Sequence, residues 1–554
     1  MPLALNPTDD VVALHVGDGV RVRAARESGY LTSLDIDLSA RDGETHCLVA
    51  MPSLPSITDT ANADLLVWLN ARYEGEGEAP RPFTLFIAGY RNGKSVGEQP
   101  ARFFAGPDDA RLALRATVPT RADRYQLVVY ADRHYRGRLV IRDIRLTVGT
   151  TEYRVGSGEH HTSQVSLARR WEQAGTRVRC SSIYGEHWAD MPQDWRLDGV
   201  NPSVLRAADW LLFSGLDRLA FGVSQPVPVG VAPHSGRAVG SRTLLHYTAT
   251  TDSTAAMTLL PEPGVRFHCQ RAFQRYSLSS GAGKELPDPA PWTDRVRRVA
   301  NTTVVPNTFE LAQIAAGGPL GFSHRYGALA FGLLLAEHVG AGVLAVGSVL
   351  DHVFLGSGHQ FVDVVALDRS SYNTVRRLVE GAGLGLALPT AGCSEVLTTR
   401  ISDTGRYAGL AISCPRAGAD GAPCGTCFAC FRRLRFAGQA APAPDESALG
   451  LLERRPLKSA ASVIYAAQRS GFRHPATDDY HDVELGFLER HFEYALEHMV
   501  PMDVAAHIRG ELRALGIHPM SEEDELHLRT IGQTFSPESF SWSRAGFGEA
   551  ASPS

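Results

Sequence analysis

The chain contains 554 residues, of which 44% are apolar and 21% are charged. That length is more than one hydrophobic core usually serves, and the composition is ordinary for globular proteins, so we expect several folded domains. Lysine and arginine together number 55 against 60 aspartates and glutamates, which leaves a net charge of −5. This balance gives no global basic field, which speaks against nucleic acid as the partner.

The sequence indicates neither a leader peptide nor a membrane span. Its first residues, MPLALNPTDD, lack a basic segment followed by an apolar one. The most apolar run, residues 326–346, is interrupted by Glu337 and His338 and predicts a buried helix and strand. Four of the eight cysteines form one cluster and the others are scattered, so we expect the chain in the reducing cytoplasm.

Residues 1–150 predict a β-sandwich, because short alternating runs such as LLVWLNARYE and YQLVVYADR are separated by turn clusters. The closing segment, RYQLVVYADRHYRGRLVIRDIRLTVG, resembles the last strands of a galactose-binding-like jelly roll, which is common in carbohydrate-binding modules. That resemblance implies sugar binding through exposed aromatic rings, and the candidates are Trp68, Tyr73, Tyr90, Tyr130 and Tyr135. The alternative is that these rings pack in the core or at strand edges.

Residues 151–235 predict a connecting region with helices. Residues 166–174 are expected to form a short helix, and Asn201 followed by Pro202 is typical of the start of a longer one. The proline- and glycine-rich stretch 225–236 predicts a domain boundary.

Residues 236–440 alternate between strand and helix patterns, which predicts an α/β domain with a doubly wound parallel sheet. Residues 441–554 predict a helical C-terminal region over residues 446–532 and a disordered tail at 536–554. Within the α/β domain, strands are expected in residues 241–249, 265–273, 297–305 and 342–348, and helices in 254–260, 324–340 and 370–384.

Four cysteines, Cys414, Cys424, Cys427 and Cys430, follow the spacing C-x9-C-x2-C-x2-C. Two overlapping C-x2-C steps and one sulfur from the preceding loop can close a tetrahedron around Zn2+, and Gly425 permits the tight turn. Four thiolates leave no position for water, so the zinc is expected to be structural. An iron–sulfur cluster and four unrelated thiols are the alternatives.

The segment TATTDS, residues 248–253, lies between a predicted strand and a predicted helix. A helix N-terminus presents N–H groups and the positive end of the helix dipole, which suit a phosphate. The hydroxyl groups of the segment can add hydrogen bonds, and Asp252 can orient Mg2+. The alternative is that Asp252 and Ser253 only cap the helix.

On these two segments, residues 240–438 resemble the PP-loop ATP pyrophosphatases, an adenine nucleotide α-hydrolase-like group, and among them the 7-cyano-7-deazaguanine synthases. The cysteine segment matches the family pattern Ser-Cys…Cys-Gly-x-Cys-x-x-Cys-x-x-Arg from Ser413 to Arg433. Residues 248–253 fall where the family has Ser-Gly-Gly-x-Asp-Ser, and Gly347 and Asp351 fall at a later strand end.

The loop departs from the family pattern. Thr248 replaces the serine, and Ala249 and Thr250 replace glycines that let the backbone approach the pyrophosphate and adopt a positive φ. Each added Cβ narrows the pocket, and the β-branched Thr250 disfavours the left-handed conformation. We therefore expect an altered pose of ATP, a different phosphate ligand, or a loss of activity.

The resemblance implies ATP-dependent activation of a small-molecule carboxylate. ATP would be cleaved between its α- and β-phosphates to give an acyl-adenylate and pyrophosphate, and ammonia or another amine would then form an amide or a nitrile. The implied catalytic residues are Asp252, Ser253, Asp351 and Arg400. The implied nucleotide-binding residues are Thr248, Ala249, Thr250, Thr251, Asp252, Ser253, His268 and Gly347, with ATP and Mg2+ as cofactors beside the zinc.

Other side chains near the same edge of the sheet have competing explanations. Arginines there can contact phosphate, or they can solvate the surface and pack at helix ends. For His268, a buried core histidine is the alternative. The remaining candidates are Arg406, Arg432, Arg433, Cys269, Arg271, Asp363 and Asp368.

Three classes of function are open. The first is an ATP-dependent amide- or nitrile-forming enzyme, whose β-sandwich recruits the substrate. The second is a catalytically inactive PP-loop scaffold or binding protein with a carbohydrate-binding-like module, which the altered loop favours. The third is a PP-loop enzyme of tRNA modification, which the negative net charge speaks against. A homodimer is compatible with each class.

Overall fold

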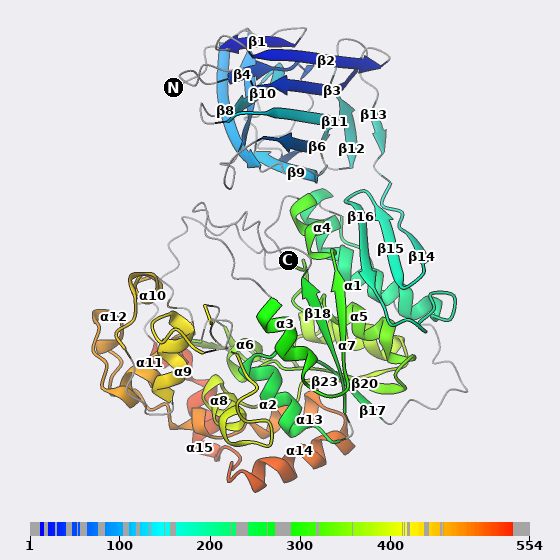
Figure 1. Ribbon diagram of the computed structural model, residues 1–554. Helices are drawn as coiled ribbons and strands as arrows, with labels where there is room; N and C mark the ends of the chain where they lie inside the picture. The colour runs from blue at the N-terminus through cyan, green and yellow to red at the C-terminus, as the bar shows by residue number, and fades with distance from the viewer. Residues whose placement is uncertain are drawn as a thin grey trace.

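The chain forms a β-rich N-terminal part, a central part built on a large sheet, and a helical C-terminal part (Figure 1). The predicted disordered tail at 536–554 and most of the predicted boundary at 225–236 lie outside the described residues. Among the residues that are described, no helix is both long and apolar enough to cross a membrane. The computed structural model describes residues 11–15, 20–27, 30–39, 47–52, 54–55, 64–75, 83–92, 94–103, 110–117, 122–131, 135–148, 150–155, 162–164, 166–221, 223–228, 242–262, 264–271, 290–316, 321–356, 358–412, 414, 416–417, 422–436, 442–454, 457 and 459–535.

Two antiparallel sheets make up the N-terminal part, which confirms its predicted all-β character. One follows the order β1 (Val12–His15), β4 (Cys47–Ala50), β10 (Arg124–Ala131), β7 (Phe83–Arg91) and β8 (Lys94–Phe103), with β5 (Leu54–Pro55) beside β10. The other follows the order β13 (Thr162–Gln164), β12 (Thr151–Arg154), β11 (Arg138–Val148), β3 (Tyr30–Asp37) and β2 (Arg21–Glu27), with β6 (Asp64–Glu74) paired to β11 and to β9 (Ala110–Thr117). Strands β12 and β13 carry this part beyond residue 150.

Alternating side chains of the two sheets fill one core, because residues two apart on a strand point to the same face. Several aromatic rings proposed for sugar binding are buried in this part. Tyr73, Tyr90 and Tyr135 are 9%, 0% and 4% exposed, so they offer no open ring to a sugar. Tyr130 is half-buried and packs edge-on against Phe86, with ring centroids 6.2 Å apart. For Tyr73, Tyr90 and Tyr135, the alternative explanation that the rings pack within the sandwich is the correct one. Tyr130 stays a candidate, because it lies outside that core cluster and keeps part of its ring exposed.

Trp68 lies at the junction between the sandwich and the central part. Its side chain is 2% exposed and stacks on Phe221, with ring centroids 5.8 Å apart and an interplanar angle of 15°. Tyr184 lies 6.0 Å from the same indole, whose N–H donates to Thr147 Oγ1 at 3.0 Å. The sandwich is therefore docked through buried aromatic contacts with Tyr184 and with Phe221 of α1 (Pro202–Phe221), the helix that the sequence predicts from Asn201.

Residues 166–174 do not form the predicted helix. Instead, β14 (Arg170–Ala174), β15 (Arg177–Ser182) and β16 (Gly185–Asp190) form an antiparallel ladder. The exposure of β14 alternates with a period of two, and Gly175 takes a φ of 63° in the turn that follows. These strands extend the central sheet, so residues 151–235 are not a separate connecting region.

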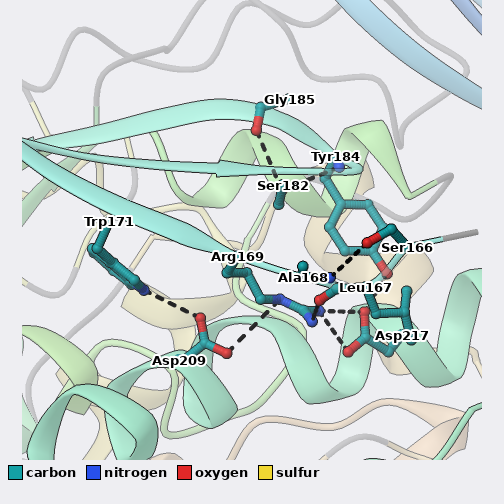
Figure 2. Close-up of polar contacts among 10 residues, drawn as sticks. All are labelled: Ser166, Leu167, Ala168, Arg169, Trp171, Ser182, Tyr184, Gly185, Asp209 and Asp217. Atoms are coloured by element: carbon teal, nitrogen blue, oxygen red, sulfur yellow. Dashed lines mark hydrogen bonds and ion pairs between the residues drawn. The ribbon is translucent and has the colours of Figure 1, made fainter. Parts of the chain in front are cut away.

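A buried ion cluster fixes the chain where it enters β14 (Figure 2). Arg169 Nη2 donates to both carboxylate oxygens of Asp217 at 2.5 and 2.6 Å, and the Tyr184 hydroxyl donates to Asp217 at 2.7 Å. Arg169 Nε lies 3.8 Å from Asp209, which also accepts the indole N–H of Trp171 at 3.3 Å. Because both aspartates belong to α1, the cluster clamps the segment before β14 onto this helix.

An eight-stranded sheet in the order β14-β15-β16-β19-β18-β17-β20-β23 forms the central part. Its last five strands are parallel: β19 (Thr302–Asn307), β18 (Val265–Arg271), β17 (Arg242–His246), β20 (Ala341–Val346) and β23 (Gly385–Ala387). The chain starts this half at β17, adds β18 and β19 on one side, and then crosses to β20 and β23 on the other. The predicted parallel sheet is confirmed, and its strand order reverses between β17 and β20.

Helices of the central part follow its strands. They are α2 (Thr251–Leu259), α3 (Ala290–Arg297), α4 (Glu310–Ala315), α5 (Leu329–Ala336), α6 (Leu350–Val353), α7 (Ser371–Gly381), α8 (Glu395–Thr404) and α9 (Phe428–Phe436), with a small hairpin of β21 (Leu355–Gly356) and β22 (Gln360–Phe361).

The C-terminal part is helical, as the sequence predicts. Its helices do not form a separate domain, because their buried side chains join the core clusters of the central sheet, such as Ile464 in one cluster and Ile508 in another. The elements are α10 (Glu446–Leu452), α11 (Ala460–Ser470), α12 (Pro475–Asp478), the 3-10 helix η1 (Gly486–Glu489), α13 (Glu493–Met499), α14 (Met502–Ala514), α15 (Glu522–Arg529) and α16 (Ile531–Thr534).

Helices cover both faces of the parallel strands. Leu244 of β17 belongs to one core cluster and Leu245 to the other, and Leu344 and Ala345 of β20 divide in the same way. One cluster includes side chains of α1, α5 and α7, and the other includes side chains of α2, α8 and α14. The carboxyl edge of the sheet is therefore where a site can form between the two helical layers.

Candidate functional site

The strand order reverses between β17 and β20, and open α/β sheets bind ligands outside the carboxyl ends of the strands at such a switch point. Two loops leave the sheet there, residues 247–250 before α2 and residues 347–349 before α6. They touch, since a Cβ added to Gly347 would lie 2.7 Å from the Asp252 carbonyl oxygen and 2.9 Å from the Ser253 nitrogen. Gly347 is therefore required where the start of α2 crosses the end of β20.

Ala249 carries the left-handed conformation in the first loop. Its φ is 56°, its side chain is fully buried, and its carbonyl accepts the Ile412 N–H at 2.6 Å. Thr250 is extended, with φ −80° and ψ 166°, and it caps α2 by accepting the Ser253 N–H on its side chain. The expectation that Thr250 would oppose a left-handed turn is wrong, because that conformation falls on residue 249.

The hydroxyl groups of Thr248, Thr250 and Ser253 form hydrogen bonds with one another. Thr248 Oγ1 lies 3.0 Å from Thr250 Oγ1 and 3.2 Å from Ser253 Oγ. Ser253 is 2% exposed and also donates to the Thr250 carbonyl at 3.1 Å, and Thr251 begins α2 with 8% of its surface exposed. The positive end of the helix dipole makes the start of α2 a candidate anion site, although the Thr250 cap already satisfies the Ser253 N–H.

Two predicted aspartates come together beside this loop. Asp252, in the first turn of α2, accepts the Thr398 hydroxyl at 3.1 Å. Asp351, in α6, accepts the Glu395 N–H at 2.8 Å and the Ser462 hydroxyl. The carboxylate of Asp351 thus joins α6 to the first turns of α8 and α11, which gives it a positioning role.

Glu395 adds a third carboxylate and pairs with Arg432 of α9. The Arg432 side chain is 16% exposed, its guanidinium lies 5.0 Å from the Phe428 ring centroid, and its buried Nε has no hydrogen-bond partner among the described residues. His352 Nε2 lies 3.8 Å from Glu395 Oε1, and its side chain is half-exposed. One guanidinium therefore shares this site with three carboxyl groups.

The surroundings of these carboxyl groups favour their protonated forms. Burial, followed by the charges of Glu395 and Asp351, raises the pKa of Asp252 to about 7, and hydrogen bonding from Thr398 opposes the rise. Burial and the Glu395 charge likewise raise the pKa of Asp351. Burial is the largest single effect on Arg432 and opposes its ionisation, but the charge and hydrogen bond of Glu395, together with the charges of Asp351 and Asp252, outweigh it and raise the arginine pKa. Such a surplus of acidic groups suits a cation such as Mg2+, which prefers oxygen ligands.

The structure does not bring Arg400 or His268 to this site. Arg400 donates to the carbonyl groups of Leu515 and Gly516 at 3.1 and 3.4 Å, so it anchors the turn after α14. His268 is 8% exposed and places Nδ1 2.9 Å from the Tyr247 carbonyl oxygen. It is a buried histidine between two strands, as the alternative explanation expects.

Of the other arginine candidates, Arg432 alone lies with these carboxyl groups in the described part of the chain. Arg406 donates to the carbonyl groups of Thr258 and Leu260 at 2.7 Å each, which caps the C-terminal end of α2. The Arg271 side chain and Ser413 lie outside what the structure describes. The remaining candidates have structural contacts: Arg433 pairs with Asp403, Asp363 accepts the Tyr494 hydroxyl, Asp368 pairs with Arg377, and Cys269 lies 3.8 Å from the Ala328 carbonyl oxygen.

The four clustered cysteines converge on one point. Their sulfur atoms all lie within 4.8 Å of one another, with 3.8 Å between Cys414 and Cys427 and 3.9 Å between Cys424 and Cys430. Sulfur atoms about 2.3 Å from a central Zn2+ form a tetrahedron with edges of about 3.8 Å, so the geometry fits this ion. Gly425 takes a φ of 80° in the turn between the ligands, as the sequence predicts for a tight turn.

Sequence reasoning missed Glu395, Thr398 and Ser462. A signal for Glu395 exists, because Ser394 caps α8 by accepting the Leu397 N–H and so places the glutamate in the first turn of a helix. Ser462 carries no such signal, since it reaches Asp351 across 111 residues of chain.

An open cavity of about 1000 Å3 lies at the edge strand β14, and none of the predicted site residues lines it. Its walls come from β14, from the turn after it and from the segment before α1. The lining residues are Trp171, Glu172, Gln173, Gly175, Thr176, Gln193, Arg196, Leu197 and Asp198.

Residues 374–532 match a protein family described as "Family of unknown function (DUF6395)". The match runs from α7 to α16, so it includes Glu395, the four clustered cysteines and the C-terminal helices. No curated protein matches the chain.

Several solved structures resemble a part of this chain. A structure described as "CBM4 structure and function" is 14% identical, with a TM-score of 0.18 over 26% of this chain and 89% of that one. The family 11 carbohydrate-binding module from Clostridium thermocellum, in complex with a mixed-linked tetrasaccharide, is 13% identical, with a TM-score of 0.19 over 27% of this chain and 91% of that one. The enzymatically active domain of bacteriophage CBA120 tailspike protein 4 is 13% identical, with a TM-score of 0.20. The match covers 25% of this chain and 19% of that structure.

Proposed function

We propose that the central part binds a nucleotide with Mg2+ at the switch point between β17 and β20 and uses it to activate a carboxylate. The observation that carries this proposal is the meeting of the two loops, which places the start of α2 beside Asp351 and Glu395. A phosphate at the start of α2 would lie next to carboxylates that can hold the accompanying metal ion. The resemblance of residues 240–438 to PP-loop pyrophosphatases is a second support for the same proposal.

Each group has a distinct role in this proposal. The first N–H groups of α2 and the Thr248 hydroxyl bind phosphate oxygens, while Asp252 and Glu395 supply oxygen ligands to Mg2+. Asp252 ionises when it binds the ion, because a nearby cation lowers its pKa from about 7. Arg432, whose Nε lacks a partner among the described residues, stabilises charge that develops on the departing pyrophosphate.

The proposed reaction is carboxylate activation followed by amine attack. An oxygen of the substrate carboxylate attacks the α-phosphorus of ATP, pyrophosphate leaves, and an acyl-adenylate forms. Ammonia or another amine then displaces AMP to give an amide. The primary amide formed from ammonia gives a nitrile only when a second ATP activates its oxygen, which then leaves as AMP. The four cysteines would hold zinc as a structural ion, since four thiolates leave no coordination position for substrate.

A catalytically inactive binding protein is the second candidate, and Ala249 is the observation that favours it. Its buried Cβ and the neighbouring Thr250 side chain occupy the loop where glycines would let a pyrophosphate approach the backbone. In that case a nucleotide binds at α2 without turnover, and the sandwich serves as a carbohydrate-binding-like module.

Pyrophosphate release distinguishes the two candidates. The zinc-loaded full-length protein is given ATP, Mg2+ and ammonium with a panel of carboxylates that includes 7-carboxy-7-deazaguanine, and Mg–ATP binding is measured in parallel by calorimetry. We expect release that depends on one carboxylate and is lost in Asp252→Ala. It should persist in Asp368→Ala, a control whose carboxylate is exposed and paired with Arg377. Binding without release would favour the inactive protein, and absence of both would refute nucleotide binding.

A further inference from the structure

One backbone contact joins the cysteine segment to the switch-point loop. Ile412, shortly before Cys414, donates its N–H to the Ala249 carbonyl at 2.6 Å. Ile412 is 4% exposed and Ala249 is fully buried, so water cannot readily take over this hydrogen bond. The loop is therefore tied to the chain that leads into the first clustered cysteine.

Ala249 depends on such a contact more than a glycine would. A left-handed φ of 56° is unfavourable for a residue with a Cβ, so it persists only where the surroundings hold it. Besides the hydrogen bond from Ile412, the half-buried Leu410 packs against the same apolar cluster as Ala249. The segment 410–412 thus stabilises the conformation on which the loop before α2 depends.

A second connection runs through α9. This helix begins at Phe428, directly after Cys427, and contains Cys430. It also carries Arg432, whose guanidinium pairs with Glu395 beside the other two carboxyl groups. The orientation of α9 therefore determines where the guanidinium of the site lies.

We propose that metal binding by the four cysteines positions the switch-point site, with Ile412 and Arg432 as positioning residues on the two sides of the metal. The site it regulates is the one given under the proposed function, so the biological meaning of this inference rests on that function. When the ion is bound, it joins Cys414 to Cys430 in the first turn of α9, so both segments are held in place by the same metal. Without it, the four thiols have no common partner, and both contacts loosen.

Hydrogen exchange of the full-length protein, without any nucleotide, tests this coupling. Zinc-loaded protein is compared with chelator-treated protein at peptides that cover residues 246–254, with residues 64–74 of the sandwich as an internal reference. We expect exchange at 246–254 to become about tenfold faster on metal removal, the change that follows from loss of about one hydrogen bond. Exchange at 64–74 should stay unchanged.

The variant Ile412→Pro separates the contact from the metal. Proline has no N–H to donate to Ala249 but leaves the cysteines intact, whereas Ile412→Val keeps the N–H and most of the apolar side chain. We expect Ile412→Pro to keep its zinc by elemental analysis and yet to exchange at 246–254 as fast as the metal-free protein. Ile412→Val should behave as wild type.

Arg432 is tested at the first turn of α8. We expect Arg432→Ala to speed exchange at residues 393–400 with the zinc still bound, and Arg432→Lys, which keeps the charge, to recover part of the protection. Equal exchange in the alanine variant and the wild type would remove Arg432 from the proposal.

Unchanged protection at 246–254 in Ile412→Pro would overturn the proposal, and so would unchanged protection in metal-free protein that has kept its fold. If metal removal unfolds the whole chain, exchange at 64–74 also rises and the metal-free protein is not informative. The exchange of zinc-loaded Ile412→Pro at 246–254 then tests the proposal by itself. A failure of the proposed function looks different. Zinc-loaded wild type that binds no Mg–ATP would refute that function and leave the exchange result standing.

Discussion

Replacement of Asp252 by asparagine should stabilise the protein at pH 8 and leave its stability nearly unchanged at acidic pH. The pKa of Asp252 rises from 3.8 to about 7 in the folded protein, because burial and then the charges of Glu395 and Asp351 disfavour the ionised form. Between these values the folded protein holds a proton that the unfolded chain has released. The free energy of unfolding therefore falls as the pH rises through this window, and asparagine avoids that loss.

The magnitude follows from the pKa difference. A rise of about three pKa units corresponds to about 4 kcal/mol. The side chain is only half-buried, so water screens part of this effect, and we expect about 2 kcal/mol to remain. Asparagine also gives up the attraction between a carboxylate and the N-terminus of α2, which is worth about 0.5 kcal/mol. The expected net gain at pH 8 is therefore about 1–2 kcal/mol.

Thermal unfolding at pH 4.5 and pH 8, without divalent ions, measures this difference. For a domain of this size we expect the midpoint of Asp252→Asn to exceed that of wild type by about 2–6 °C at pH 8 and by much less at pH 4.5. Asp368→Asn is the matched control, because its carboxylate is exposed, and it should show no such pH dependence. If Asp252→Asn is less stable than wild type by the same amount at both pH values, the reasoning is refuted.

Three further substitutions test individual contacts. Trp68→Ala should weaken the docking of the sandwich on α1 by about 3–5 kcal/mol and split calorimetric unfolding into two transitions, while Trp68→Phe should retain part of the stack. Gly347→Ala should cost about 1–3 kcal/mol in urea denaturation, because its Cβ would lie 2.7 Å from a carbonyl of α2, while Gly450→Ala, with nothing within 4 Å, should not. Arg169→Met should cost about 3–5 kcal/mol by the same measurement, since it leaves Asp217 buried without its cation, and Arg169→Lys should recover part of this. Each contact has an outcome that contradicts its proposed role. These outcomes are a single unfolding transition in Trp68→Ala, equal destabilisation by the two glycine variants, and unchanged stability in Arg169→Met.

The parallel half of the sheet and the cysteine group could be predicted because both are encoded locally. Strand β20 is a short apolar run, β17 is centred on Leu244 and Leu245 and followed by turn residues, and the spacing of the cysteines is typical of a metal site. The strand β14 could not be read in the same way, because its five residues, RWEQA, alternate in exposure but not in polarity, and Gln173 breaks the period of two. Its ladder joins the parallel strands through Ala189 and Asn307 and through the neighbouring hydrogen bonds between Trp188 and Thr308, which are 120 residues apart in sequence.

The candidate site was harder to predict because its groups come from distant segments. Arg432 and Glu395 are 37 residues apart in the sequence, and no local sequence pattern predicts that they form a pair. Arg400 lies about 140° around α8 from Glu395, so the helix that brings Glu395 and Thr398 to the site turns Arg400 away from it. The start of α2 could be read locally, since Thr250 is an ordinary helix cap.

Calorimetric titration of Mg–ATP into zinc-loaded full-length protein at pH 8, with Asp252→Asn beside wild type, tests the central claim most directly. The variant should be at least as stable as wild type at this pH, so a change in binding reports on the site and not on folding. We predict one binding event in wild type and at least about tenfold weaker binding in Asp252→Asn, because a carboxylate ligand of the metal ion is lost. No binding to wild type, or equal affinity for the two proteins, would contradict nucleotide binding at the switch point between β17 and β20.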